Sequence, residues 1–159
     1  MAKVLRSAGF RDNDRLQQAA VSHAYHVQKG DQGPHVGRIQ AFLLLSGIFQ
    51  KTDDFLVPED RAGYEDGFQK EFLDDYFGEW TEVTVWMYKD DRQIIDRSRQ
   101  SFADAIVGVM TIRRMDAEQV KMDAEAPPLE ARQQAAAFAP PKYKSLVVAG
   151  PRILAQRLG

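Results

Sequence analysis

Two pairs of adjacent carboxylates are the first candidates for chemistry in this sequence. They are Asp53 with Asp54, and Asp74 with Asp75. Two carboxyl groups can cleave a glycosidic bond when one of them keeps its proton in an apolar pocket. Both pairs lie in strongly polar stretches, where solvated side chains are the simpler interpretation. The sequence therefore predicts no catalytic residue and no enzyme.

Three histidines raise the question of a metal site. His23 and His26 are three residues apart, and His35 follows. Zinc sites normally need further protein ligands and partners that orient each imidazole, and nothing in the sequence brings His35 to the pair. Ser22 next to His23 is no nucleophile motif, because neighbouring residues on a helix point in different directions. Phosphate-binding loops, dinucleotide fingerprints and H-E-x-x-H are absent, so neither metal nor cofactor is predicted.

Length and composition favour one ordinary domain. A chain of 159 residues with 44% hydrophobic residues can bury roughly two thirds of its unfolded surface. It has no cysteine, which excludes disulfides and thiolate metal sites. A net charge of -2 gives no sign of a nucleic-acid binder. Acids crowd between Asp53 and Asp75, whereas the tail from Lys142 is basic, and solvated surface is the simplest interpretation of both.

The N-terminus does not resemble a targeting signal. No apolar stretch follows its basic residues, and no run in the chain approaches the roughly 18 apolar residues of a membrane span. We expect a protein that is cytoplasmic at synthesis. Any role in the periplasm or cell wall would then need a non-classical route of delivery.

Hydrophobic spacing predicts the elements of the first third. Residues 1–29 form an irregular arm and a lead-in helix from about Asn13 to His26. A second helix, Pro34–Ser46, begins at a proline and ends before Gly47. It is apolar nearly all round, which predicts burial on more than one side.

The rest of the chain alternates turns and helices. Residues 50–71 are expected to form an acidic loop insertion with a short helix near its end. A helix is predicted after Gly78. Two alternatives remain open: the helix continues through Ile95, or residues Val83–Trp86 form a strand instead. Another helix spans about 109–124. Residues 125–159 are expected to form a Pro/Ala-rich link, with a helix left open, and an apolar, basic tail that docks on this domain or on a partner.

Three glycine-bearing blocks give this pattern a family likeness. Over Gly30–Asp116, their order and spacing resemble the peptidoglycan-binding domain of the three-helix-bundle type. The residues that carry the resemblance are Gly30, Gly33, Val36, Ile39, Leu43 and Gly47; Asp74, Phe77, Gly78, Thr81, Val85 and Tyr88; and Asp104, Val107, Gly108 and Thr111. Asp75 and Ala105 stand where the family has glycine. The resemblance implies a mainly α fold, a three-helix bundle over 30–124, extended here by an N-terminal helix and a C-terminal docking tail.

The motif residues should act mainly in folding. Asp74 and Asp104 can accept N–H groups across their turns, and Thr81 and Thr111 can satisfy N-terminal amides. The family implies a non-catalytic, cell-wall-targeting module whose ligand is peptidoglycan. If that function is kept, Tyr76, Trp80 and Asp104 are the candidate ligand contacts, with packing against the acidic segment or the tail as the alternative for Trp80.

Two functions remain open at this stage. One is the peptidoglycan-binding module. The other is a protein–protein adaptor or structural subunit on the same fold, for example in a phage-like particle or contractile injection machine, whose partner would be another protein chain docking on the C-terminal tail. A small lytic enzyme has no identifiable site.

Overall fold

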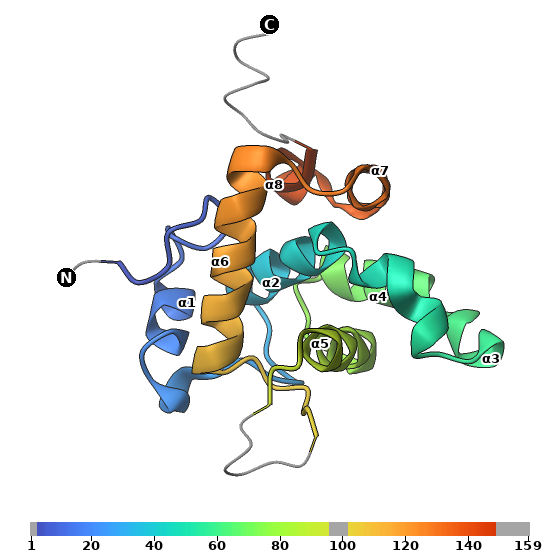
Figure 1. The fold of residues 1–159 in the computed structure, drawn as a ribbon, viewed down its shortest axis with the longest axis horizontal. Coiled ribbons are helices and arrows are strands. Elements are labelled where there is room, and N and C mark those ends of the chain that lie inside the picture. The colour runs from blue at the N-terminus through green and yellow to red at the C-terminus, as the bar shows by residue number, and fades with distance from the viewer. Residues whose placement is uncertain (1–2, 96–101, 149–159) are drawn as a thin grey trace, which may run out of the picture.

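Helix α2 (Pro34–Leu45) occupies the middle of the molecule (Figure 1). The structure is a computed structural model that describes residues 3–95 and 102–148. Pro34 is at the first helical position, and Gly47 adopts φ 89° just beyond the end, a conformation that glycine adopts without a steric cost. Most of α2 is buried, and α4, α5, α7 and α8 all contact it. The prediction of a helix covered on several sides is confirmed.

Two further long helices begin directly after glycines. They are α5 (Glu79–Arg92) and α6 (Val109–Glu125), with Gly78 and Gly108 as their N-cap residues. The strand alternative around Val83–Trp86 is wrong, because these residues lie inside α5. The continuation through Ile95 is also wrong, because Gln93 adopts a left-handed conformation that ends the helix.

The turns before α5 and α6 pair with the same extended segment. Val27 forms an antiparallel bridge with Val107, and Gln32 forms one with Tyr76. Gly30 N and Phe77 O are 2.8 Å apart, and Phe77 N and Asp31 O are 2.9 Å apart. The stretch just before α2 therefore holds both turns. No β-strand longer than these bridges occurs in the part of the chain that the structure describes.

The acidic segment is a correction to the sequence analysis. The predicted helix near the end of 50–71 is present as α4 (Tyr64–Leu73), but the rest is not a loop: it forms η2 (Ile48–Asp54) and α3 (Pro58–Arg61). Tyr64, Phe68 and Phe72 recur every four residues and are fully buried. The ring centroids of Phe49 and Phe68 are 4.8 Å apart. Acidic residues lie on the exposed side of this helix. Because the whole segment is rich in acids, the apolar spacing of the three aromatic residues is hard to recognise in the sequence.

The N-terminal arm is irregular, as predicted, but it belongs to the core. Leu5 and Phe10 are completely buried, and the Asp116 carboxylate on α6 accepts the N–H groups of Arg6 and Ser7. The predicted helix to His26 is wrong. Helix α1 spans only Asp14–Ala19, and η1 (His23–Tyr25) begins after an extended Ser22.

The C-terminal part folds back over α2. Helix α7 (Leu129–Phe138), η3 (Pro141–Tyr143) and α8 (Lys144–Val148) lie together at the top of Figure 1. Tyr143 and Val147 are buried, so the described part of the tail docks on its own domain. The prediction for 149–159 lies outside the described residues.

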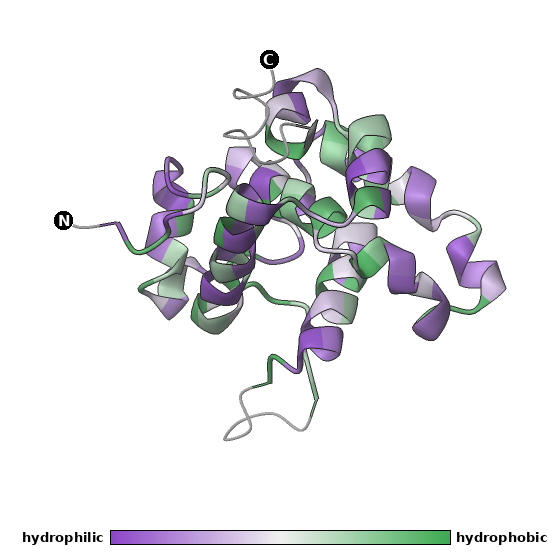
Figure 2. Ribbon diagram, turned by 45° about the horizontal axis from the view of Figure 1, so that its top comes forward, coloured by the Kyte–Doolittle hydropathy of each residue, from purple (hydrophilic) through white to green (hydrophobic). Residues whose placement is uncertain are grey.

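Amphipathic character is plain along most of the chain. In Figure 2 the helices carry hydrophilic and hydrophobic residues side by side, as expected for elements buried on one face. Within residues 3–95 and 102–148, no helix is both long and apolar enough to cross a membrane.

Candidate functional site

The candidate ligand contacts from the sequence lie on or beside two turns, and different side chains surround these turns in the structure. We name residues 74–78, before α5, the second turn, and residues 104–108, before α6, the third turn. Both lead through a glycine into a helix whose first N–H groups have no partner within that helix. Each turn can bind a ligand through these N–H groups only where no acceptor from elsewhere in the chain already occupies them.

At the second turn, the chain fills the helix start with its own carboxylate. Glu71 Oε1 accepts from Gly78 N at 3.1 Å and Thr81 N at 2.8 Å, and Oε2 accepts from Trp80 N at 3.0 Å. A negative charge at this end also suits the helix dipole. A Cβ on Gly78 would lie 2.5 Å from Glu71 Oε2, so the carboxylate uses the space that glycine leaves.

The C-terminal segment covers the other side of the second turn. Asp75 adopts φ 54°, and its two carboxylate oxygens accept from Tyr143 Oη and Lys142 Nζ, each at 2.7 Å. The Tyr143 ring stacks on Phe72 with centroids 5.2 Å apart. Burial, and then the hydrogen bond to Asp75, raise the pKa of Tyr143, so the phenol remains a neutral donor. Ala105, the other residue in a family glycine position, is not among the described residues with positive φ.

The three predicted ligand contacts do not form one surface. Trp80 packs on α4, with its ring 5.8 Å from that of Tyr64 and its edge over Gly67. Tyr76 is 40% exposed at the second turn. Asp104 lies on the third turn, in a hollow that neither aromatic residue lines. The packing alternative for Trp80 matches its position.

The third turn borders a hollow of about 240 Å³, which we name the third-turn hollow. Lys89 lies in its wall with only 5% of its surface exposed, and Lys89 Nζ pairs with Asp104 and donates to Ile106 O at 2.7 Å. The hollow therefore combines a buried cation, imidazoles, a helix start and apolar side chains. Its lining is His23, His26, Lys89, Ile94, Asp104, Ile106, Gly108, Val109, Met110 and Thr111.

Some motif residues have roles other than those predicted. Asp104 Oδ1 accepts from Ile106 N at 2.9 Å, as expected of its turn. Asp74 is exposed, and Glu71 takes the role predicted for it. The Thr81 hydroxyl accepts from Gln40 Nε2 at 2.9 Å inside the core, which corrects its predicted function as a helix cap.

His35 lies apart from the other two histidines in the structure. His23 and His26 line the third-turn hollow, whereas His35 is at the start of α2 and does not. Burial, and then the nearby Arg15 guanidinium, lower the pKa of His35. In the described ranges, no three histidine or carboxylate side chains are grouped so that they could hold a metal ion.

The carboxylates of the two acid pairs are either exposed or bound by other side chains. Asp53 forms an ion pair with Arg61, and its side chain is 75% exposed. In the other pair, Asp75 is bound to the tail and Asp74 is exposed.

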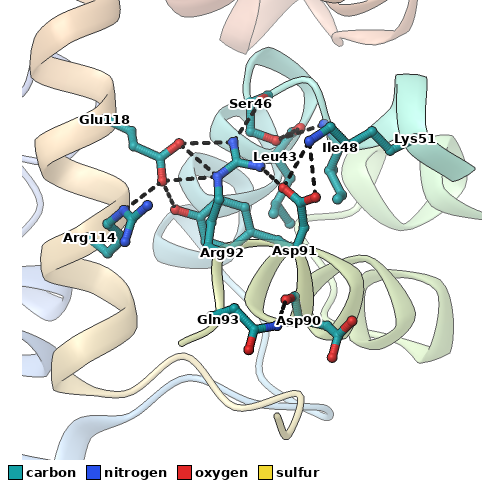
Figure 3. Close-up of polar contacts among 11 residues, drawn as sticks. Leu43, Ser46, Ile48, Lys51, Asp90, Asp91, Arg92, Gln93, Arg114 and Glu118 are labelled. Carbon is teal, nitrogen blue, oxygen red and sulfur yellow. Dashed lines mark hydrogen bonds and ion pairs between the residues drawn. The ribbon is translucent and has the colours of Figure 1, made fainter. Parts of the chain in front are cut away.

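A second charged cluster joins the C-terminal ends of α2 and α5 to the middle of α6 (Figure 3). Arg92 Nη2 donates to Ser46 O and to Glu118 Oε1, both at 2.9 Å, and Lys51 Nζ donates to Asp91 at 3.0 Å. Burial opposes ionisation of Asp91, but hydrogen bonds from Lys51 and Arg92 outweigh it and lower the pKa of Asp91. A hollow of about 830 Å³ lies beside this cluster. Because its charges already pair with one another, the cluster acts as a structural tie.

Sequence reasoning missed the groups that distinguish the two turns. Glu71 is seven residues before Gly78, a separation that no local capping rule covers. Lys89 directly follows the motif residue Tyr88 in the sequence, and its burial beside Asp104 depends on the fold. No protein-family model matches this chain, and comparison with curated proteins and with solved structures also gave no match.

Proposed function

We propose that this chain is a non-catalytic peptidoglycan-binding module. Its core would be a three-helix bundle of α2, α5 and α6, to which the N-terminal helix and the C-terminal tail are added. The observation that carries the proposal is that both glycine-bearing turns pair with the segment just before α2. The three sequence blocks of the resemblance thus meet in space.

The third-turn hollow is the better candidate for the ligand surface. Glu71, Lys142 and Tyr143 occupy the polar groups of the second turn, so a ligand there would have to displace them. The third-turn hollow offers polar groups beside the exposed side chain of Met110. Such a mixed surface suits a glycan with short peptide stems.

Co-sedimentation with insoluble peptidoglycan sacculi tests this proposal. We expect retention at physiological salt, and a severalfold loss of retention for Met110→Glu, which places a charge at the hollow. Val120→Glu is the matched control, because Val120 is also an exposed apolar residue of α6 (43%, against 53% for Met110) and does not line the hollow. Tyr76→Ala at the second turn should bind like the unchanged protein.

The other outcomes of the sacculus experiment are equally clear. Retention only at low salt would indicate non-specific attraction, which salt screens. No retention at either salt would contradict wall binding. Equal loss for Met110→Glu and Val120→Glu would contradict the assignment of the third-turn hollow.

A protein–protein adaptor is the second candidate. It is favoured by an apolar hollow of about 250 Å³ where α4 meets α7, lined in part by Leu73, Phe138 and Pro140. Leu73 is 59% exposed there, and a contiguous exposed apolar surface can mark a protein–protein contact. An adaptor would form an assembly that Leu73→Lys weakens and Met110→Glu leaves intact, as measured by light scattering across concentration.

A further inference from the structure

We propose that two copies of this chain exchange their C-terminal segments, residues 129–148, and form a dimer in which each segment packs on α2 of the other copy. The partner is therefore a second copy of the chain, and the interaction surface is the one that the segment covers within a single chain. Three features of the structure favour this exchange: where the segment packs, which contacts hold it, and the conformation of its hinge. The exchange goes beyond peptidoglycan binding and does not depend on it.

The segment packs on elements that are distant from it in the sequence. It follows α6 directly, yet the main contacts of α7 are with α2, η2 and α8, and those of α8 are with α2, α7 and η3. In Figure 1 the segment lies over α2, at the end of α6 from which it continues. Because its surface of attachment lies mainly on α2 and not on the helix that it follows, the same surface of a second copy can receive it unchanged.

The apolar contacts of the segment form one regular stripe. The buried positions recur every four residues and are Ala131, Ala135, Ala139, Tyr143 and Val147. Three of the five are alanines, whose side chains bury little apolar surface. Tyr143 is the largest of them, and it stacks on Phe72 and lies against Gly37 of α2. The segment can therefore detach at a smaller cost than a helix of the central core, and its stripe fits the same groups on a second copy.

Polar contacts at the edge of the segment are equally suited to exchange. Gln134 Oε1 accepts from Gln50 Nε2 at 2.7 Å, and Gln134 Nε2 donates to Glu65 Oε1 at 3.2 Å. Lys142 Nζ donates to Asp75 at 2.7 Å. Water can satisfy each of these groups while the segment is detached, so opening leaves no buried polar group unpaired here. In the dimer each contact is kept, with its partner now on the other copy.

The hinge, residues 126–128, contains a strained residue. Ala126 adopts φ 88° and ψ 143°, a combination that residues other than glycine rarely adopt and that costs free energy. Pro127 follows it, and a residue before proline normally has the same ψ with a negative φ. Rotation of Ala126 about φ alone would therefore remove the strain and turn the segment away from its own α2.

The two prolines favour an extended hinge once Ala126 has rotated. Proline fixes its own φ, and Pro128 is extended with ψ 143°. Consecutive prolines form a semi-rigid, extended spacer that does not readily turn back. Because exchange keeps the contacts of the segment, the balance between the two forms is set by hinge strain against the cost of association. Short hinges under strain shift this balance towards exchange.

Sedimentation velocity of the full chain, from micromolar to near-millimolar concentration, tests the role of the hinge. We expect a dimer whose fraction rises with concentration. Ala126→Gly should weaken dimerisation about tenfold or more, because glycine accepts the positive φ and so stabilises both monomers that make one dimer. Ala126→Val should strengthen it, since a β-branched residue raises the cost of positive φ and suits an extended hinge.

Ala124→Gly is the matched control for the hinge variants. Ala124 is an exposed alanine in the last turn of α6, two residues before Ala126, and it has no positive φ. The substitution lowers helix propensity, but α6 is the same in the monomer and in the exchanged dimer. We therefore expect dimerisation to change by no more than about twofold.

Chemical crosslinking distinguishes an exchanged dimer from a contact between two outer faces. The chain has no cysteine, so Gln50→Cys and Gln134→Cys introduce the only thiols, at side chains that touch across the surface of attachment. A short bis-maleimide should join a Gln50→Cys chain to a Gln134→Cys chain after the two are equilibrated together at high concentration. One chain that carries both substitutions should crosslink internally at low concentration, which shows that the two thiols are within reach.

Three results would overturn the proposal: a monomer at every concentration, a dimer in which the two single variants do not crosslink, or equal dimerisation of Ala126→Gly and Ala124→Gly. The exchanged dimer should also persist in Leu73→Lys, because the contacts of that residue are the same in both forms, and loss of the dimer there would indicate the adaptor surface instead. None of these outcomes changes the sacculus result, so failure of the exchange and failure of wall binding are distinguishable.

Discussion

At the level of single residues, Glu71 organises the start of α5 more than any motif residue does. One carboxylate satisfies three N–H groups that the helix itself leaves unpaired. It reaches them from the last turn of α4, so it also fixes how α4 and α5 meet. The contrast with the third turn, where no such residue is seen among the described ones, is the basis of the proposed ligand site.

Replacing Glu71 by alanine should lower the free energy of unfolding by about 1–3 kcal/mol, because three partly buried N–H groups lose their acceptor. Asp74→Ala is the control: this exposed carboxylate, four residues before Gly78, should change stability by no more than about 0.5 kcal/mol. Urea unfolding followed by circular dichroism measures both. A larger loss for Asp74→Ala would mean that the motif aspartate holds the turn after all.

At the level of elements, charged side chains tie the ends of α2 and α5 to the middle of α6. Arg92, at the last residue of α5, reaches Ser46 O beyond α2 and Glu118 on α6 (Figure 3). The Tyr88 hydroxyl, one turn earlier, also donates to Glu118. Only a guanidinium offers enough donors in one plane for such a junction.

This tie predicts a loss of stability in acid. The pKa of Asp91 is lower in the folded protein than its ordinary value of 3.8, so the unfolded chain binds a proton more readily. The stability that Asp91 contributes is therefore complete above about pH 4 to 5 and disappears as the pH falls through the lower folded-state pKa. Asp91→Asn should reduce the acid-dependent part of the loss between pH 5 and pH 2.5 in urea unfolding. Parallel pH curves for the variant and the unchanged protein would contradict this assignment.

At the level of the whole molecule, distant parts of the sequence close over α2. Tyr143 joins one of them to α2: it stacks on Phe72 and donates to Asp75, and it lies against Gly37 of α2, where a Cβ would be 2.0 Å from its hydroxyl oxygen. The C-terminal segment is therefore part of the core, although it follows the region that resembles a known domain. It also makes the second turn unavailable to a ligand.

Two substitutions of Tyr143 distinguish the contribution of its ring packing to stability from that of its hydrogen bond. Tyr143→Ala should cost about 3–5 kcal/mol, since it removes a buried aromatic ring. Tyr143→Phe keeps the ring and loses only the donor to Asp75, so we expect about 1–2 kcal/mol. Urea unfolding gives both values. Near-zero effects for both would mean that the tail is not part of the cooperative core.

The sequence by itself determined the elements whose signal is local. Apolar spacing, Pro34 and Gly47 gave α2, and the glycine-led stretches gave α5 and α6. It predicted only a short helix near the end of the acidic segment and not the whole of α4, because three acids share that helix with the three aromatic residues that bury it. Nor did it give the shortened α1: the apolar spacing does not show that Ser22 is extended and that its hydroxyl accepts from Ala24 N at the start of η1.

Only the tertiary structure decided what each turn holds. Glu71, Tyr143 and Lys142 reach the second turn from elsewhere in the chain, and Lys89 and the histidines gather at the third. The two turns share a leading aspartate and a closing glycine (DDYFG and DAIVG), and neither stretch shows which distant side chains will reach it. Helix periodicity follows from nearest neighbours along the chain, whereas occupancy of a turn depends on which distant side chains folding brings to it.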